Sequence, residues 1–95
     1  MTNVVITAVL KAKPGKEAEA LAALQEVVTP SREEEGCMTY QLHQSLEDIS
    51  TFVFYEVWKD AEAVQKHVES AHYVTYREKA AELFEDRTVY KLAKV

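Results

Sequence analysis

The feature that most constrains the fold of this chain is an alternation between two kinds of hydrophobic spacing. Four segments have the two-residue period of β-strands, namely residues 4–13, 37–44, 51–58 and 88–95. Two regions between them have the spacing of amphipathic helices, from Lys16 to Val28 and from Asp60 to Phe84. The predicted order of elements is therefore β-α-β-β-α-β.

This order is the split βαβ pattern of ferredoxin-like α+β folds, in which two helices cover one face of a four-stranded antiparallel sheet. A chain of 95 residues can bury the core of one domain but not of two. We therefore expect residues 1–95 to form a single domain. With 47% hydrophobic residues and only two Gly and two Pro, the chain should fold rather than remain disordered.

Residues 4–13 and 51–58 are apolar on both faces of the predicted strands. In the second segment, Phe52, Phe54, Glu56 and Trp58 share one face, and the opposite face carries Val53, Tyr55 and Val57. Two helices can cover only one face of the sheet, so the other face needs a cover that the predicted elements do not supply. We expect this cover to be a second copy of the chain, in a homodimer packed sheet to sheet.

The end of the first helix is predicted from local signals. Pro30 should stop or kink the helix, because proline lacks the backbone N–H that a helix interior needs. Ser31 and Glu34 match a capping box for a short continuation, which Gly36 ends. The charged run Glu33–Glu35 is interpreted as a solvated face.

The charge balance argues against two classes of partner. Eleven Lys and Arg stand against sixteen Asp and Glu, giving a net charge of -5 that opposes binding to nucleic acid or to an anionic membrane. No apolar stretch approaches the roughly 20 residues of a membrane helix. The single cysteine, Cys37, has no partner for an internal disulfide and is interpreted as an inert thiol. Because the N-terminus also lacks the pattern of a signal segment, the expected location is cytoplasmic.

Glu56 is the most unusual residue of the chain, because a carboxylate shares a predicted buried face with Phe54 and Trp58. A buried carboxyl group needs either a partner or a raised pKa. One interpretation is a structural salt bridge or an edge position. The other is a cavity-lining role in which the carboxylate orients a histidine or moves a proton.

Histidines are candidate bases, since imidazole is the natural general base near neutral pH. On an unbroken helix, His67 and His72 would point in directions roughly 140° apart and would not share a face. A break at Ser70-Ala71 would allow both imidazoles to approach the sheet and Glu56. The alternative is one capping or hydrogen-bonded histidine and one solvated histidine. His43 is interpreted as a surface residue.

Two histidines and one carboxylate also have the composition of a non-haem iron site, but their spacing matches neither H-E-x-x-H nor H-x-x-E-H. We therefore expect no metal. The aromatic stripe of Tyr73, Tyr76 and Phe84 is predicted to be core, although together with Phe54 and Trp58 it could line a pocket for a flat aromatic ligand. Two glycines in the whole chain leave no phosphate-binding loop.

One set of residues resembles the antibiotic biosynthesis monooxygenase family: the segment Phe52–Asp60, followed by Ala63, His67, Ser70, His72 and Tyr73. The family pattern is E-x-W, a helix with a histidine, then S-x-H and an aromatic residue. The resemblance covers nearly the whole chain. It implies a dimeric α+β barrel of ferredoxin-like monomers, with a pocket between the sheet and the helices of each monomer.

By this resemblance the matching site residues are Glu56, Trp58, His67 and His72, with Trp58 shaping the pocket and a histidine acting as the base. Some members of the family oxidise quinols or polyketide phenols without metal, flavin or haem, which implies no cofactor here. Similar proteins include isomerases that process a phosphorylated autoinducer, and haem-degrading monooxygenases.

Two departures from the family pattern narrow the chemistry. Polyketide-oxidising members have an Asn where this chain has Phe54, which argues against that particular substrate class. Haem-degrading members have a Trp and a His where this chain has His67 and Arg77, which argues against haem chemistry.

The leading hypothesis is a small cofactor-independent monooxygenase that acts with O2 on a phenol or quinol-type aromatic. His67 or His72 would remove a proton, Glu56 would fix the imidazole, and the resulting anion would donate an electron to O2. Trp58 would exclude water from the pocket. An isomerase of a small carbonyl compound would use the same groups for enolisation. A third hypothesis is a non-catalytic module that binds a ligand or stabilises a dimer.

Overall fold

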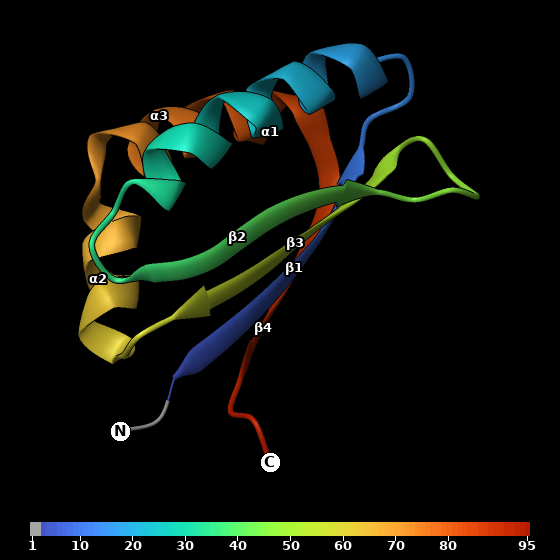
Figure 1. Ribbon diagram of the computed structural model, residues 1–95. Coiled ribbons are helices and arrows are strands. Elements are labelled where there is room, and N and C mark those ends of the chain that lie inside the picture. Colours follow the sequence, from blue (N-terminus) through green and yellow to red (C-terminus); the bar gives the residue numbers. More distant parts are fainter. Residues whose placement is uncertain (1–2) are drawn as a thin grey trace.

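The computed structural model describes residues 3–95 and contains three helices on one face of a four-stranded sheet (Figure 1). The elements follow in the order β1 (Val4–Ala12), α1 (Glu17–Arg32), β2 (Cys37–Gln44), β3 (Thr51–Trp58), α2 (Ala61–Glu69), α3 (Ala71–Leu83) and β4 (Phe84–Leu92). Neighbouring strands are antiparallel and lie in the order β2-β3-β1-β4. The architecture is the expected ferredoxin-like α+β fold, with its second helical region divided in two.

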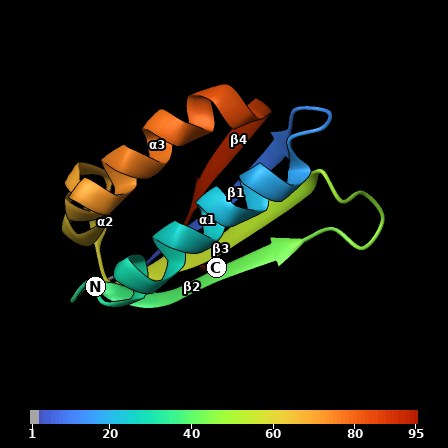
Figure 2. The same ribbon diagram turned by 90° about the horizontal axis from the view of Figure 1, so that it is seen from above.

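The core lies between the inner face of the sheet and the helices. Alternate residues of the two central strands point inward because of the two-residue period of a strand, and the buried apolar ones are Ile6, Ala8, Leu10, Ala12, Phe52, Phe54 and Trp58. From above the sheet, Leu24 and Val27 of α1 complete this layer, and both are at most 1% exposed. Figure 2 shows α1 and α3 side by side over the sheet.

The first helix continues through Pro30 to Arg32, so the predicted stop at Pro30 is wrong. The proline removes one backbone donor near the end of the helix, where Val27 and Ser31 are 1% and 0% exposed and fix the last turns in the core. Ser31 is therefore a buried helix residue, and the predicted capping box with Glu34 is also wrong. Residues 33–36 form a turn that leads into β2.

The second helical region is interrupted at Ser70, whose backbone is extended at φ -69° and ψ 151°. The hydroxyl of Ser70 caps the C-terminal end of α2 and the N-terminal end of α3. Ser70 Oγ donates to the carbonyl oxygen of His67 at 2.6 Å and accepts from the backbone N–H of Tyr73 at 3.3 Å. The helix break that would bring His67 and His72 together is thus present.

The last strand begins earlier than the sequence predicts. The helical spacing of Tyr76 and Ala80 predicts Phe84 on the helix, but Phe84 pairs with Ala12 as the first residue of β4. The strand ends at Leu92 rather than at Val95. Among the described residues, no helix combines the length and the hydropathy needed to cross a membrane.

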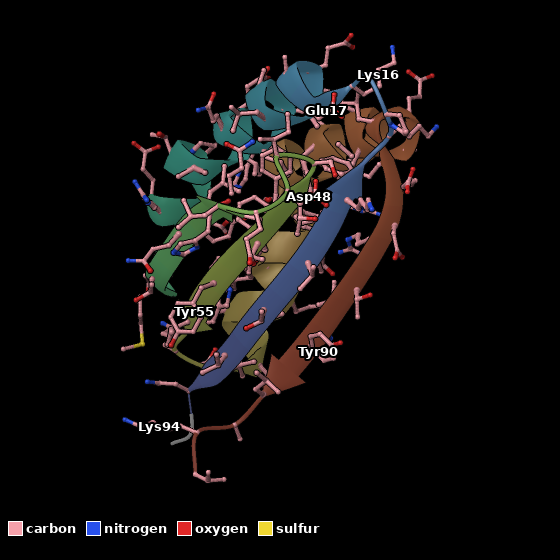
Figure 3. The ribbon with its side chains drawn as sticks, turned by 90° about the vertical axis from the view of Figure 1, so that its right-hand side faces the viewer. Lys16, Glu17, Asp48, Tyr55, Tyr90 and Lys94 are labelled. Atoms are coloured by element: carbon pink, nitrogen blue, oxygen red, sulfur yellow. The ribbon has the colours of Figure 1, made fainter. Side chains whose placement is uncertain are left out.

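The outer face of the sheet carries apolar side chains that no part of residues 3–95 covers. Tyr55, Tyr90 and Leu92 are 40%, 52% and 47% exposed, and Figure 3 labels Tyr55 and Tyr90 on this face. Val53 and Val57 lie on the same face and are partly buried. This is the face for which the sequence predicts a second copy of the chain.

Gly36 lies where the turn after α1 contacts the first turn of α2. A Cβ atom at position 36 would overlap the Cβ atom of Ala63. The carbonyl of Gly36 also accepts a hydrogen bond from the backbone N–H of Lys59 at 3.0 Å, which ties the turn to the end of β3. We therefore expect Gly36→Ala to lower the free energy of unfolding by about 1–3 kcal/mol, the usual cost of overpacking. Urea denaturation followed by circular dichroism measures this loss.

The double variant Gly36→Ala/Ala63→Gly is the control. It removes the methyl group that the new side chain meets, so it should recover most of the loss apart from roughly 1 kcal/mol for a glycine within a helix. Equal destabilisation in the single variant Gly36→Ala and the double variant would show that this contact is not the cause.

Candidate active site

The site is organised around the carboxylate of Glu34, in the turn between α1 and β2. Its Oε2 atom lies 2.7 Å from Nδ1 of His67, near the end of α2, and 2.8 Å from Nε2 of His72, in the first turn of α3. A carboxylate accepts hydrogen bonds, so both imidazoles donate an N–H to the same oxygen. One side chain therefore joins a turn to two helices that begin far along the chain. The left-hand side of Figure 1 shows this turn beside α2 and the start of α3.

The contact with Glu34 sets the tautomer of His67. The His67 side chain is 3% exposed, and burial lowers its pKa below the ordinary value although Glu34 acts in the opposite direction. With its proton on Nδ1, the neutral ring carries its lone pair on Nε2. His67 lines a pocket on the inner face of the sheet, and Glu34 is not part of that lining. Nε2 is therefore the nitrogen left for the pocket.

The pocket has a volume of about 260 Å³ and lies between α2 and α3 on one side and the inner face of the sheet on the other. Its aromatic walls are Tyr40, Phe54, Tyr73 and Tyr76. Its ionisable groups are Glu56, His67, Arg87 and Lys91, and the remaining walls are aliphatic. An apolar pocket with a few convergent polar groups is the usual form of a small-molecule site.

Glu56 lies on β3, opposite Ile6 of β1 and Tyr40 of β2. The residue is 5% exposed, and its Oε1 atom accepts a hydrogen bond from Nε1 of Trp58 at 2.9 Å. Burial raises the pKa of Glu56 to about 7, although the Trp58 hydrogen bond and the positive charge of Arg87 act to lower it. Near pH 7 the protonated and ionised forms of Glu56 therefore coexist.

Trp58 lies beneath the pocket rather than on its wall. It is 0% exposed, and the centroid of its ring is 4.5 Å from that of His67. The indole therefore supports two residues of the pocket lining, by packing against His67 and by donating a hydrogen bond to Glu56. The sequence predicts a wall-forming role for Trp58, and the geometry gives it a supporting one.

The structure brings most of the predicted site residues together, but their hydrogen-bond partners differ from the predicted ones. Glu56, His67, Phe54, Tyr73 and Tyr76 all line the pocket. His72 is absent from that lining and lies behind Glu34. The hydrogen bond of Glu56 goes to Trp58, and the carboxylate that is hydrogen-bonded to both His67 and His72 is that of Glu34.

Glu34 was missed because its run of three glutamates resembles a solvated surface. One signal could have identified it. The run follows the C-terminal end of a helix, where the helix dipole disfavours negative charge, so a glutamate there suggests a partner elsewhere in the fold. Of the two remaining candidates, His43 is exposed as predicted, and burial raises the pKa of the Cys37 thiol, which disfavours the reactive thiolate.

Glu34, His67 and His72 also mark the place where a metal ion would bind if the protein held one. Their ligand atoms lie within 4.8 Å of one another, and two imidazoles with one carboxylate are a common ligand set for iron. The two hydrogen bonds already satisfy these three atoms, and a metal would have to replace an N–H proton on each ring. The expectation that no metal is needed stays a prediction.

Comparisons with known proteins agree with this fold. A family model described as antibiotic biosynthesis monooxygenase matches residues 3–79. The Bacillus subtilis protein named Putative monooxygenase YcnE is 40% identical over 80 residues, which is 84% of each chain. An uncharacterised Synechocystis protein is 29% identical over 92 residues, 97% of this chain, and the chain spans 63% of that relative's length. The crystal structure of PA3566 from Pseudomonas aeruginosa has a TM-score of 0.96 at 28% identity, covering 100% of this chain and 96% of that one.

Glu56 should make the stability of the fold depend on pH. Its pKa is about 7 in the folded protein and 4.5 for the free side chain, so the folded state binds more protons between these values. The free energy of unfolding therefore falls as the pH rises through this range, by on the order of 3 kcal/mol. Glu56→Gln keeps an acceptor for Trp58 but cannot ionise. Urea denaturation should show that its stability relative to wild type grows by about 2–3 kcal/mol from pH 5 to pH 8.5.

Glu47→Gln makes the same chemical change at an exposed position and should show no such growth. His67 has a lowered pKa, so its own contribution to stability rises with pH, but it is present in every variant and cancels in the comparison. A difference between Glu56→Gln and wild type that stays constant with pH would mean that Glu56 ionises normally.

Proposed function

Because this chain belongs to the antibiotic biosynthesis monooxygenase family, we propose that it is a monooxygenase that adds one atom of O2 to a phenol or quinol-type aromatic without a cofactor. The observation that carries the proposal is the pair of groups that line one pocket, His67 and Glu56. Burial moves their pKa values in opposite directions, lowering that of His67 and raising that of Glu56 to about 7. Such a separation assigns one group as base and the other as acid.

The size and walls of the pocket support a substrate with one aromatic ring. A volume of about 260 Å³ is below the roughly 300–1,000 Å³ of drug-sized sites. Four aromatic side chains line it and favour offset or edge-to-face contact with a flat ring. A fused multi-ring substrate fits these dimensions poorly.

In the first step, Nε2 of His67 removes the proton of the phenol. Glu34 holds Nδ1–H at 2.7 Å and stabilises the imidazolium that forms. The phenolate is a better electron donor than the phenol, and it transfers one electron to O2. The phenoxyl radical and superoxide then combine to form a carbon–oxygen bond.

The second proton transfer completes the balance of the reaction. Protonated Glu56 donates a proton to the outer oxygen of the ring-bound peroxide, and its carboxylate then takes the proton of the C–H bond at the same carbon. The electrons of that C–H bond form the carbonyl as the O–O bond breaks, and the departing hydroxide takes the proton of the His67 imidazolium and leaves as water. The substrate supplies all four electrons that O2 accepts. A phenol with a free ortho or para C–H therefore gives a quinone and one water, and no external reductant is consumed.

His72 acts through Glu34 in this scheme. Its Nε2–H donates to the same carboxylate oxygen at 2.8 Å and also lies 3.1 Å from Oγ of Ser70. These contacts hold the Glu34 carboxylate in the position that orients His67. His72 is thus a positioning residue, whereas His67 is the base.

An isomerase of a small carbonyl compound is the second candidate function. His67 and Glu56 would move a proton between two carbons through an enol, with the same division into base and acid. The observation that favours this candidate is the presence of Arg87 and Lys91 in the pocket lining, because two cations suit the phosphate group of a phosphorylated substrate.

The proposal predicts that the protein consumes O2 when it is supplied with a suitable single-ring phenol or quinol. His67→Ala should lower kcat by roughly a hundredfold or more, the range usual for loss of a general base. An oxygen electrode with a panel of such compounds measures both effects. Wild-type kcat/KM should fall below the lowered pKa of His67, and the His67→Ala profile should lack this acidic limb.

His72→Ala is the matched control, since it removes the same ring from a position outside the pocket lining. We expect a smaller loss of kcat and little change in KM. Full activity of His67→Ala would contradict its assignment as base. Deuterium exchange into a hydroxyketone without O2 uptake would favour the isomerase, and the absence of both would favour a binding module. Loss of activity on chelation, restored by iron, would assign the Glu34 cluster to a metal.

We also propose that the outer face of the sheet packs against the same face of a second copy. Exposed Tyr55 and Tyr90 would be buried there, together with Val53 and Val57, as in sheet-on-sheet packing. Sedimentation at micromolar concentration should give a dimer, and Val57→Arg should shift it to monomer. Val74→Arg places the same charge at an exposed position on α3 and should leave the dimer intact. A monomeric wild-type protein would contradict the proposal.

A further inference from the structure

Two cationic residues of the pocket lining, Arg87 and Lys91, take no part in the acid–base steps proposed for the oxidation. Arg87 of β4 lines the pocket, and its Nη2 atom donates a hydrogen bond to the hydroxyl oxygen of Tyr73 at 3.0 Å. Within residues 3–95, no carboxylate oxygen lies within 4.0 Å of the Arg87 guanidinium. Arg87 therefore faces the pocket with an unneutralised positive charge.

This charge acts inside the pocket. It lowers the pKa of Glu56 and that of Tyr76, in both cases against the larger effect of burial. Arginine presents several N–H donors in a planar fork, which suits the oxygens of a carboxylate or a phosphate. The hydroxyl of Tyr73 accepts from Arg87, so its own proton remains free to donate. The guanidinium of Arg87 and the hydroxyl of Tyr73 are thus two adjacent hydrogen-bond donors.

Tyr73 contacts both the base and this cation. Its ring centroid is 4.9 Å from that of His67, and its hydroxyl accepts from Arg87. All three residues line the same pocket. A para-substituted ring with a phenol at one end and an anionic group at the other offers one group to His67 and one to Arg87.

The register of the strands leaves room for such a ring. Val89 of β4 pairs with Ala8 of β1, and Ala8 pairs in turn with Phe54 of β3. All three side chains line the pocket, and Ala8 is small enough to leave a shallow floor between them. Lys91, four residues beyond Arg87 on the same face of β4, adds positive charge at the rim of the pocket.

We propose that Arg87 and the hydroxyl of Tyr73 bind an oxyanion substituent of the substrate, so that the substrate is a hydroxyaryl acid with its phenol O–H directed at His67. The proposal rests on the proposed function for the identity of the reacting ring. The oxyanion is a carboxylate or a phosphate, which offer the same acceptor chemistry to an arginine. The subsite itself requires only binding and no turnover.

Three para-substituted probes of similar shape test the subsite: 4-hydroxybenzoate, 4-hydroxyphenyl phosphate and 4-hydroxybenzyl alcohol. Calorimetric titration of the 95-residue wild-type chain should show that one or both anions bind roughly 10- to 100-fold more tightly than the neutral alcohol. The difference should shrink at high ionic strength, because the contact lies near the surface. The anion with the higher affinity identifies the oxyanion.

Variants assign the effect to named residues. Arg87→Gln should remove most of the preference for the anions and leave the affinity for the alcohol unaffected, whereas Tyr73→Phe should cause a smaller loss of anion affinity. Arg87→Lys keeps the charge but not the fork and should fall between Arg87→Gln and wild type. Lys16→Gln removes one charge from an exposed lysine outside the pocket lining and should change nothing. Thermal melting confirms that each variant is folded.

The outcomes separate this inference from the proposed function. Equal affinity of the wild type for anionic and neutral probes, or anion binding that survives Arg87→Gln, would overturn the subsite and leave the oxidation of phenols intact. Failure of all three probes to bind would overturn both, because it would remove the aromatic substrate from the pocket. Binding of anions that depends on Arg87, in a protein without O2 uptake, would support the subsite and overturn the proposed reaction.

Discussion

Two hydrogen bonds to one oxygen of Glu34 hold together the part of the molecule that would carry chemistry. They join the turn after α1 to the end of α2 and the start of α3, three segments that the chain alone does not place together. The break at Ser70 is what allows both helices to direct a histidine at the same carboxylate, since an unbroken helix would turn the rings apart. The orientation of His67, whose ring packs against Trp58, depends on this junction.

Burial has opposite effects on the pKa values of Glu56 and His67, which both line the pocket. It raises the pKa of Glu56 and lowers the pKa of His67, so each group is moved toward its neutral form. A neutral acid and a neutral base cost far less to bury than a carboxylate and an imidazolium. The pocket can therefore remain mostly apolar and still contain a proton donor and a proton acceptor. The neutral forms that are less costly to bury are also the forms in which Glu56 can donate a proton and His67 can accept one.

Much of the fold could be predicted from the sequence, because hydrophobic residues that alternate over a short, well-bounded segment indicate a β-strand from local geometry alone. The predicted bounds of β2 and β3 are confirmed at both ends, as is the burial of Glu56 beside Phe54 and Trp58. The errors have tertiary causes. Pro30 stays in the helix because its neighbours are packed in the core, and Glu34 joins the site through a contact across 33 residues. Arg87 carries no local signal, since its role depends on a tyrosine of α3.

The two ends of the pocket differ in how firmly they are tied to the core. His67 and Glu56 are buried and linked to Glu34 and Trp58, so a change in any of them disturbs several packed neighbours. Arg87 is exposed on β4, which is an edge strand of the sheet. Mutations at exposed edge positions usually cost little stability. Over evolutionary time, substitutions on β4 can therefore alter the proposed anion subsite at little cost in stability, whereas substitutions at His67 or Glu56 also disturb the fold and are removed by selection for folding.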